Sequence, residues 1–171
     1  MAFDFADRVC SLVLISTSSA TLGDWDFLLL MLVFIAFATT AEVDWSDASS
    51  VIEYLVDYSR VLAGDQRPLD EASRRALVRR DVDRAGDVAA LQNHDAVSGS
   101  EPSSAALSSI TVPTLVVHGT ADPMFPPAHG EALAAEIPGA GLLLLDGAGH
   151  GVDRADWDAV VAAIIEHTAA G

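Results

Sequence analysis

The sequence contains no lysine and a single cysteine, and both shortages exclude classes of protein. Nine arginines stand against 25 acidic residues, so the net charge of −16 argues against nucleic acid and anionic lipid as partners. The lone cysteine, Cys10, cannot form an internal disulfide, which favours a reducing, cytoplasmic compartment. Its apolar sequence neighbours predict a buried and unreactive thiol.

The sequence also lacks the patterns that hold metals and cofactors. No set of histidine, cysteine and acidic residues has the spacing of metal ligands, and no glycine-rich phosphate loop is present. We therefore expect neither a metal nor a cofactor. With 171 residues, of which 51% are hydrophobic, the chain is long and apolar enough for one folded domain with a substantial core.

Long hydrophobic runs are absent except at 27–38, which is uncharged and apolar. This run is shorter than the about 20 residues that a membrane-spanning helix needs. It also lacks the basic residues that precede the apolar part of a signal peptide. We interpret it as an apolar helix or a lid segment over a cleft, with association at a membrane surface as the less favoured alternative.

Three short apolar segments, 9–15, 114–118 and 142–145, are predicted to be buried strands. They show no polar alternation, which is typical of parallel strands covered on both faces. Helices are predicted from Pro126-Pro127 to about Glu136 and again after Asp156, which would cap the last helix. Strands joined by helices indicate the α/β class with a parallel sheet. The expected apolar stripe of the last helix comprises Trp157, Val160, Val161, Ile164 and Ile165.

The segment 44–96 changes to a helical period. A first helix is predicted to begin near Asp47 or Ser49 and to end before Gly64. A second is predicted to begin at Asp70, and a third to cover about 83–93. The apolar face of the first helix would comprise Val51, Leu55, Tyr58 and Leu62. Arg74, Arg75, Arg79 and Arg80 are expected near the C-terminal end of the second helix as a solvated face, with a phosphate site as the alternative.

Two titratable residues follow two of the predicted strands. Asp122 comes after 114–118, and His150 comes after 142–145. Because the carboxyl ends of parallel strands meet at one edge of a sheet, we expect these side chains to reach hydrogen-bond distance. A buried carboxylate that orients an imidazole lets the imidazole act as a general base. Alone, Asp122 would be read as a turn cap and His150 as a loop histidine; their matched contexts favour a catalytic pair. His118 and His129 are expected to be structural, and His94 and His167 solvated.

These segments resemble the C-terminal half of the α/β-hydrolase family, and the resemblance covers nearly the whole chain. PTLVVHGTADPMFP resembles the acid-bearing strand and loop of that family, LLLLDGAGHG its histidine segment, and DRVCSLVLISTS the strand after its nucleophile helix. The lid stretch VIEYLVDYSRVLAG is similar to bacterial esterase-like members, including aclacinomycin methylesterase relatives. The resemblance implies a partial fold: a three-stranded parallel sheet remnant at 1–19 and 110–171, with a helical lid and linker at 20–109.

The family's nucleophile motif, G-x-S-x-G, occurs nowhere in the chain. In this family the triad runs in the order Ser, Asp, His, so Asp122 and His150 match the acid and the base, and the serine would fall about eight residues before Met1. Ser16, Ser18 and Ser19 lack the flanking glycines and are interpreted as linker residues. The resemblance thus implies a truncated serine esterase or acyl hydrolase, inactive alone, whose parent family acts on small ester-like substrates.

Two alternatives remain open on this scaffold. Dehalogenase-like or haloperoxidase-like chemistry is compatible with the same acid and base. A non-catalytic binding or assembly protein would instead use the lid cleft and the open edge of the sheet. Since 9–15 would form an exposed apolar edge strand, we expect the chain to self-associate when expressed alone.

Overall fold

The computed structural model describes residues 6–18, 36–37, 39–93 and 106–169. The apolar run 27–38, apart from 36 and 37, lies outside the described residues, as do Ser19 and His94. None of the described helices combines the length and the hydrophobicity needed to span a bilayer. Within the described ranges, four short 3-10 helices accompany the longer elements, at Ala6–Arg8, Val88–Gln92, Leu107–Ser109 and Arg154–Asp156.

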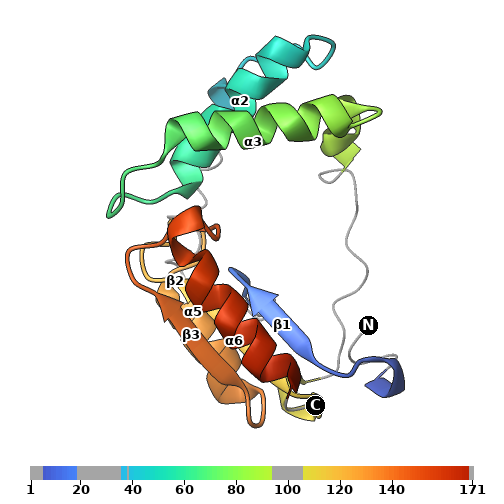
Figure 1. Cartoon of the computed structure of the whole chain (residues 1–171), viewed down its shortest axis with the longest axis vertical. Helices are drawn as coiled ribbons and strands as arrows, with labels where there is room; N and C mark the ends of the chain where they lie inside the picture. Colours follow the sequence, from blue (N-terminus) through green and yellow to red (C-terminus); the bar gives the residue numbers. More distant parts are fainter. Residues whose placement is uncertain (1–5, 19–35, 38, 94–105, 170–171) are drawn as a thin grey trace.

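The centre of the fold is a parallel sheet of three strands in the order β1-β2-β3 (Figure 1). The strands are β1 (Leu12–Ile15), β2 (Thr114–Gly119) and β3 (Gly141–Leu145). β1 lies within its predicted segment, and β2 and β3 each extend one residue beyond theirs, so the predicted parallel α/β fold is confirmed. The predicted division of the chain at 20 and 109 stays a prediction.

The first strand starts later than the sequence predicts, at Leu12 rather than at Val9. The amide of Leu12 donates to the carbonyl of Pro113, 2.9 Å away, and β2 begins at the next residue. Residues before Leu12 therefore have no part of β2 beside them, and Cys10 is exposed. The prediction of a buried Cys10 is wrong.

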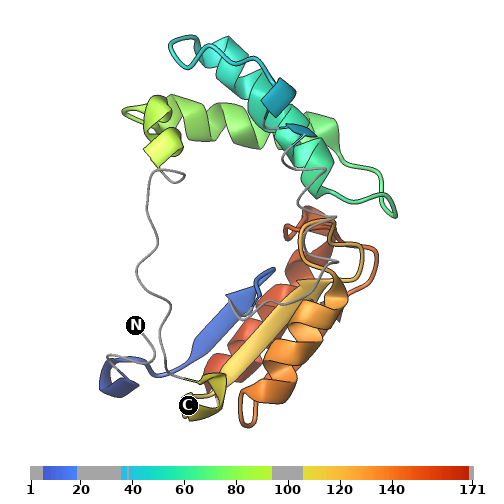
Figure 2. The same ribbon diagram turned by 180° about the vertical axis from the view of Figure 1, so that it is seen from behind.

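Helices cover both faces of the sheet (Figures 1 and 2). Helix α5 (Pro127–Glu136) contacts β2 and β3 on one face, and α6 (Trp157–Ala169) lies on the other. The core beneath α6 contains Leu115, Val117, Leu145, Ala148 and Val160.

Two predictions of burial on these elements are partly wrong. Leu142 and Leu144 each remain 39% exposed because β3 has β2 as its only strand neighbour among the described residues. On α6, Val160 is buried and Ile164 is partly buried, whereas the other predicted members of the stripe face outward. These are Trp157, Val161 and Ile165, with exposed fractions of 50%, 53% and 62%.

Beyond the carboxyl ends of the strands lies a helical hairpin of α2 (Ala48–Leu62) and α3 (Glu71–Arg84) (Figure 1). Asp47 and Asp70 cap the two helices by accepting from the amides of Ser49 and Ser73, in agreement with the predicted starts. The hairpin has its own aliphatic core, made of Val51, Ile52, Val56, Val78 and Val82. In place of the predicted helix at about 83–93, α3 runs to Arg84, its C-cap Ala85 is extended, and a 3-10 helix follows.

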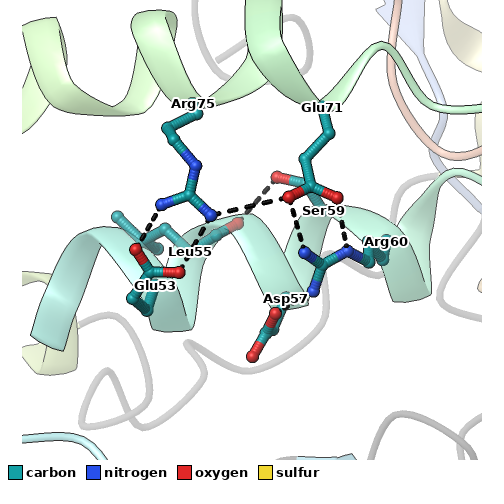
Figure 3. A network of polar contacts seen from close by, with 7 residues as sticks. All are labelled: Glu53, Leu55, Asp57, Ser59, Arg60, Glu71 and Arg75. Atoms are coloured by element: carbon teal, nitrogen blue, oxygen red, sulfur yellow. Dashed lines mark hydrogen bonds and ion pairs between the residues drawn. The ribbon is translucent and has the colours of Figure 1, made fainter.

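Charged side chains join the two helices on the exposed side of the hairpin (Figure 3). Arg75 pairs with Glu53, and Arg60 pairs with Glu71 at 2.8 Å. The hydrogen bond from Arg75 lowers the pKa of the Glu53 carboxyl, and that from Arg60 lowers the pKa of Glu71. The predicted position of Arg74 and Arg75 near the C-terminal end of the helix is wrong, because α3 continues to Arg84. Both arginines have acidic partners, Asp153 and Glu53.

Candidate active site

Asp122 is held rigidly in the loop that follows β2. Its side chain is 0% exposed, and its Oδ1 accepts hydrogen bonds from the amides of Met124 at 2.8 Å and Phe125 at 2.9 Å. An aspartate that binds the backbone two or three residues further on forms a stable local turn. The turn leaves the second carboxylate oxygen, Oδ2, directed to another partner.

That partner is His150, in the loop that follows β3. Its Nδ1 donates to Asp122 Oδ2 at 2.9 Å and lies 3.2 Å from Oδ1. The expected hydrogen bond between the two residues is therefore confirmed. Because an ionised carboxylate only accepts hydrogen bonds, the proton of the neutral imidazole resides on Nδ1 and the lone pair on Nε2. The imidazole side chain is 20% exposed, so it is accessible to a reactant while the carboxylate is not.

The two loops meet through their backbones at Gly119, the last residue of β2. A Cβ atom at Gly119 would lie 2.2 Å from the carbonyl oxygen of Gly149 and 2.3 Å from that of Ala148. The amide of Ala121 donates to the carbonyl of Ala148 at 2.9 Å. Any side chain at Gly119 would push the loops apart, so this glycine permits the approach of Asp122 to His150.

A buried histidine, His118, supports the loop of Asp122. Its side chain is 0% exposed, and its Nε2 donates to the carbonyl of Phe125 at 2.8 Å. Gly130 of α5 packs directly on the ring, since a Cβ there would lie 2.7 Å from it. These contacts are structural in kind, as the sequence suggests for His118.

The remaining described histidines lie outside the Asp122–His150 pair. His129, in the first turns of α5, makes a 2.7 Å hydrogen bond with the hydroxyl of Ser18 through Nδ1. The prediction that His167 is solvated is wrong, since its Nε2 is buried without a hydrogen-bond partner among the described residues. In the described part of the chain, no group of three or more histidine, cysteine and acidic residues is placed to hold a metal ion.

An open pocket lies between the hairpin and the loop of His150. Its cavity volume is about 70 Å³, and its lining includes Ser59, Leu62, Arg74, His150 and Asp153. Sequence reasoning missed the contributions of Leu62 and Arg74. For Leu62, the one hint in the sequence is Gly64, which predicts that the first helix ends close to Leu62. No sequence pattern predicts that Arg74 pairs with Asp153.

In this structure a buried carboxylate is hydrogen-bonded to an accessible imidazole at the carboxyl edge of a parallel sheet. This arrangement is typical of α/β hydrolases. The chain belongs to the α/β-hydrolase family. Residues 89–171 match the family described as TAP-like protein.

Relatives and solved structures agree with this membership. The chain is 32% identical over 124 residues to rhodomycin D methylesterase DauP of Streptomyces sp., which covers 70% of this chain and 41% of the relative. It is 37% identical over 114 residues to polyketide synthase ThaQ of Burkholderia thailandensis, over 66% of this chain and 5% of that protein. The chain thus spans less than half the length of these relatives.

The same fold occurs in solved structures of low sequence identity. An enol-lactonase from Burkholderia xenovorans superposes with a TM-score of 0.63 at 22% identity, over 97% of this chain and 58% of that one. An esterase from Exiguobacterium antarcticum gives a TM-score of 0.61 at 16% identity, over 94% and 57%. The match extends over nearly the whole chain, which establishes the fold.

Proposed function

We propose that this chain carries the acid and the base of an ester-hydrolysing α/β hydrolase, with Asp122 as the acid and His150 as the base. The observation that supports it best is the 2.9 Å hydrogen bond between His150 Nδ1 and Asp122 Oδ2 at the carboxyl edge of the sheet. The similarity to the rhodomycin D methylesterase DauP favours a small-molecule ester as the substrate.

In the proposed reaction, His150 Nε2 takes the proton of a serine hydroxyl as the serine oxygen attacks the ester carbonyl. The imidazolium that forms is stabilised by the carboxylate of Asp122. It then gives the proton to the departing alcohol, and an acyl-enzyme is left. A water molecule, deprotonated by the same Nε2, attacks the acyl carbonyl and releases the acid and the free serine.

We further propose that the nucleophile is not among these 171 residues, so that the chain alone is inactive or very weak. No serine in the sequence has the G-x-S-x-G context. Ser16 follows β1 in a left-handed conformation with φ of 46°, and Ser18 is hydrogen-bonded to His129, but neither has flanking glycines. Without the G-x-S-x-G motif, the sequence also lacks the residue after the nucleophile whose backbone amide would stabilise the oxyanion.

A fluorophosphonate probe tests the absence of a nucleophile directly. The chain expressed alone should remain unlabelled and should not hydrolyse a p-nitrophenyl ester above the buffer rate. Stoichiometric labelling, mapped by peptide mass to Ser16 or Ser18, would show that a serine of this chain is the nucleophile.

A chimaera tests the roles of Asp122 and His150. The N-terminal part of a methylesterase relative, through its elbow serine and the following helix, would be joined ahead of this chain. Labelling and ester hydrolysis should appear, and His150→Gln or Asp122→Asn should each remove at least about 99% of the turnover, since triad members act as a unit. His167→Gln, a matched change outside the pair, should leave turnover intact. Equal activity of His150→Gln and the parent chimaera would refute the proposed base.

A binding or assembly role is the second candidate, and exposed apolar side chains favour it. Ile15 is 42% exposed and pairs in register with Val117, so it lies on the α6 side of the sheet. Trp157, Val161 and Ile165 are at least half exposed on α6 itself. Light scattering of the chain alone should show association that Val161→Glu reduces and that Leu91→Glu, an equally exposed position beyond α3, does not. A monodisperse monomer would exclude this role.

A further inference from the structure

The turn that joins α2 to α3 touches both loops of the acid–base pair. The amide of His150 donates to the carbonyl of Leu62 at 2.8 Å, and Leu62 is the last residue of α2. Carbonyls in the last turn of a helix lack a partner within the helix, so His150 satisfies one of them. Two residues later, Gly64 lies against the acid loop: a Cβ there would be 2.4 Å from the carbonyl oxygen of Ala121.

Arg67, in the same turn, reaches both ends of the histidine loop. One guanidinium nitrogen donates to Asp156 Oδ1 at 2.7 Å, and the other donates to the carbonyl oxygen of Asp146. Asp146 directly follows β3 and Asp156 directly precedes α6, so one planar group spans the loop that carries His150. A guanidinium presents its donors in a fixed planar fork, which suits a bridge between these two acceptors.

The burial of Asp156 makes this contact more than a surface ion pair. The residue is 5% exposed, and its Oδ2 has no hydrogen-bond partner among the described residues. A buried carboxylate without a cation is strongly unfavourable, so Arg67 determines where Asp156 can lie. The sequence prediction that Asp156 caps the last helix is not what the structure shows, since its charge is directed to the hairpin.

We infer that Arg67 is a positioning residue for His150, acting through Asp146 and Asp156, and that the α2–α3 turn couples the hairpin to the acid–base pair. A hairpin displaced from the sheet would release the carbonyl that binds the His150 amide and the guanidinium that spans its loop. The hydrogen bond to Asp122 would then lose its fixed geometry. The inference rests on the proposed role of His150, but its readouts are spectroscopic and require no turnover.

Nuclear magnetic resonance of the full 171-residue chain tests the inference. In the parent chain, imidazole ¹⁵N shifts should identify the Nδ1–H tautomer of His150, and its amide should exchange slowly with solvent. Arg67→Gln should shift the ring toward a mixture of tautomers and speed exchange of the His150 amide by roughly tenfold, the factor that corresponds to about 1.4 kcal/mol. Arg67→Lys keeps the charge but not the fork, so it should recover only part of the parent behaviour.

Controls on the same hairpin separate positioning from general loss of stability. Arg75→Gln removes an arginine that pairs with Glu53 and Glu71, and it should leave the His150 signals unchanged. Gly64→Ala should reproduce the effect of Arg67→Gln, whereas Gly86→Ala, where a Cβ meets nothing within 4 Å, should not.

The inference is overturned if His150 in the Arg67→Gln chain has the same tautomer and the same amide exchange rate as in the parent chain. Should that variant fail to fold, the uncharged pair Arg67→Gln/Asp156→Asn avoids the unpaired carboxylate and carries the same test. Unchanged His150 signals in the double variant would overturn the inference equally. If the chimaera is inactive but Arg67→Gln changes the His150 tautomer and amide exchange as expected, the result counts only against the proposed function.

Discussion

The hairpin and the sheet body bury different kinds of side chain. The buried residues of the hairpin are aliphatic, such as Val51, Val56 and Val78, and its ion pairs lie on the exposed side (Figure 3). The sheet body buries polar groups as well, namely Thr114, His118, Asp122 and Asp156. Burying a polar group is costly unless a partner satisfies it, so the sheet body depends on hydrogen bonds such as those of Asp122, whereas the hairpin depends on packing.

This difference indicates a division of work between the two regions. The hairpin has its own aliphatic core and contacts the loop of His150, and the body contains the groups that would perform chemistry. The two meet at the α2–α3 turn and the loop of His150. Substitutions should therefore have effects that differ in kind as well as in size between the regions.

The largest expected effect is at Asp122. Asp122→Ala leaves the amides of Met124 and Phe125 and the imidazole of His150 without their acceptor in a buried site. We expect a loss of about 3 kcal/mol in the free energy of unfolding, measured by urea denaturation. Asp122→Asn keeps an acceptor oxygen and should cost less. A loss under about 1 kcal/mol for Asp122→Ala would show that these hydrogen bonds contribute little.

Matched core substitutions sharpen the comparison. Val117 in β2 and Val56 in α2 are both 0% exposed, so truncation to alanine removes the same groups from two separate cores. Each should lower stability by about 2 kcal/mol. Amide exchange should accelerate mainly in the sheet for Val117→Ala and mainly in α2 and α3 for Val56→Ala. Equal acceleration everywhere would mean that the two cores unfold as one unit.

A smaller effect is expected at His150. Its side chain is 20% exposed and adds little to either core, so His150→Ala should lower stability by less than about 1 kcal/mol. Thermal denaturation of the variant beside the parent chain provides the measurement. A loss as large as that of Asp122→Ala would assign His150 a structural role.

The smallest effect concerns the ion pairs of the hairpin. The pKa values of Glu53 and Glu71 are lowered from an ordinary 4.5 by Arg75 and Arg60, respectively. A carboxyl with a lowered pKa stabilises the fold above its ordinary pKa, and this stabilisation is lost as the pH falls through the lowered value. Circular dichroism melts of Arg75→Gln and the parent chain should therefore differ slightly at neutral pH and converge in acid. The difference should also shrink in concentrated salt, and a difference that persists in acid would contradict the assignment.

Part of the fold and of the site could be predicted because local patterns determine it. Asp47 and Asp70 cap their helices through amides two or three residues away, and Asp122 binds the amides of its own turn. The approach of His150 to Asp122 follows from parallel strands that share one edge. Such features depend on short stretches of chain and on one general property of parallel sheets.

The failed predictions concern features that depend on distant neighbours. Cys10 is exposed because β2 begins at Thr114, too late to pair with it. Leu142 and Leu144 are partly exposed because β3 has a strand on one side only among the described residues. The pattern of apolar residues in a segment does not show which other elements pack beside it. The sequence therefore predicts burial for residues that no neighbouring element covers in the structure.

By itself, the sequence determined the class of fold, the three strands, the helix caps at Asp47 and Asp70, and the approach of Asp122 to His150. These follow from periodicity, capping and turn chemistry, which act over a few residues. Only the tertiary structure decided that Arg67 and Leu62 reach the loop of His150, and that Asp156 faces the hairpin. The physical reason is that partners separated by up to 89 residues are chosen by the packing of whole elements, and no local pattern encodes that choice.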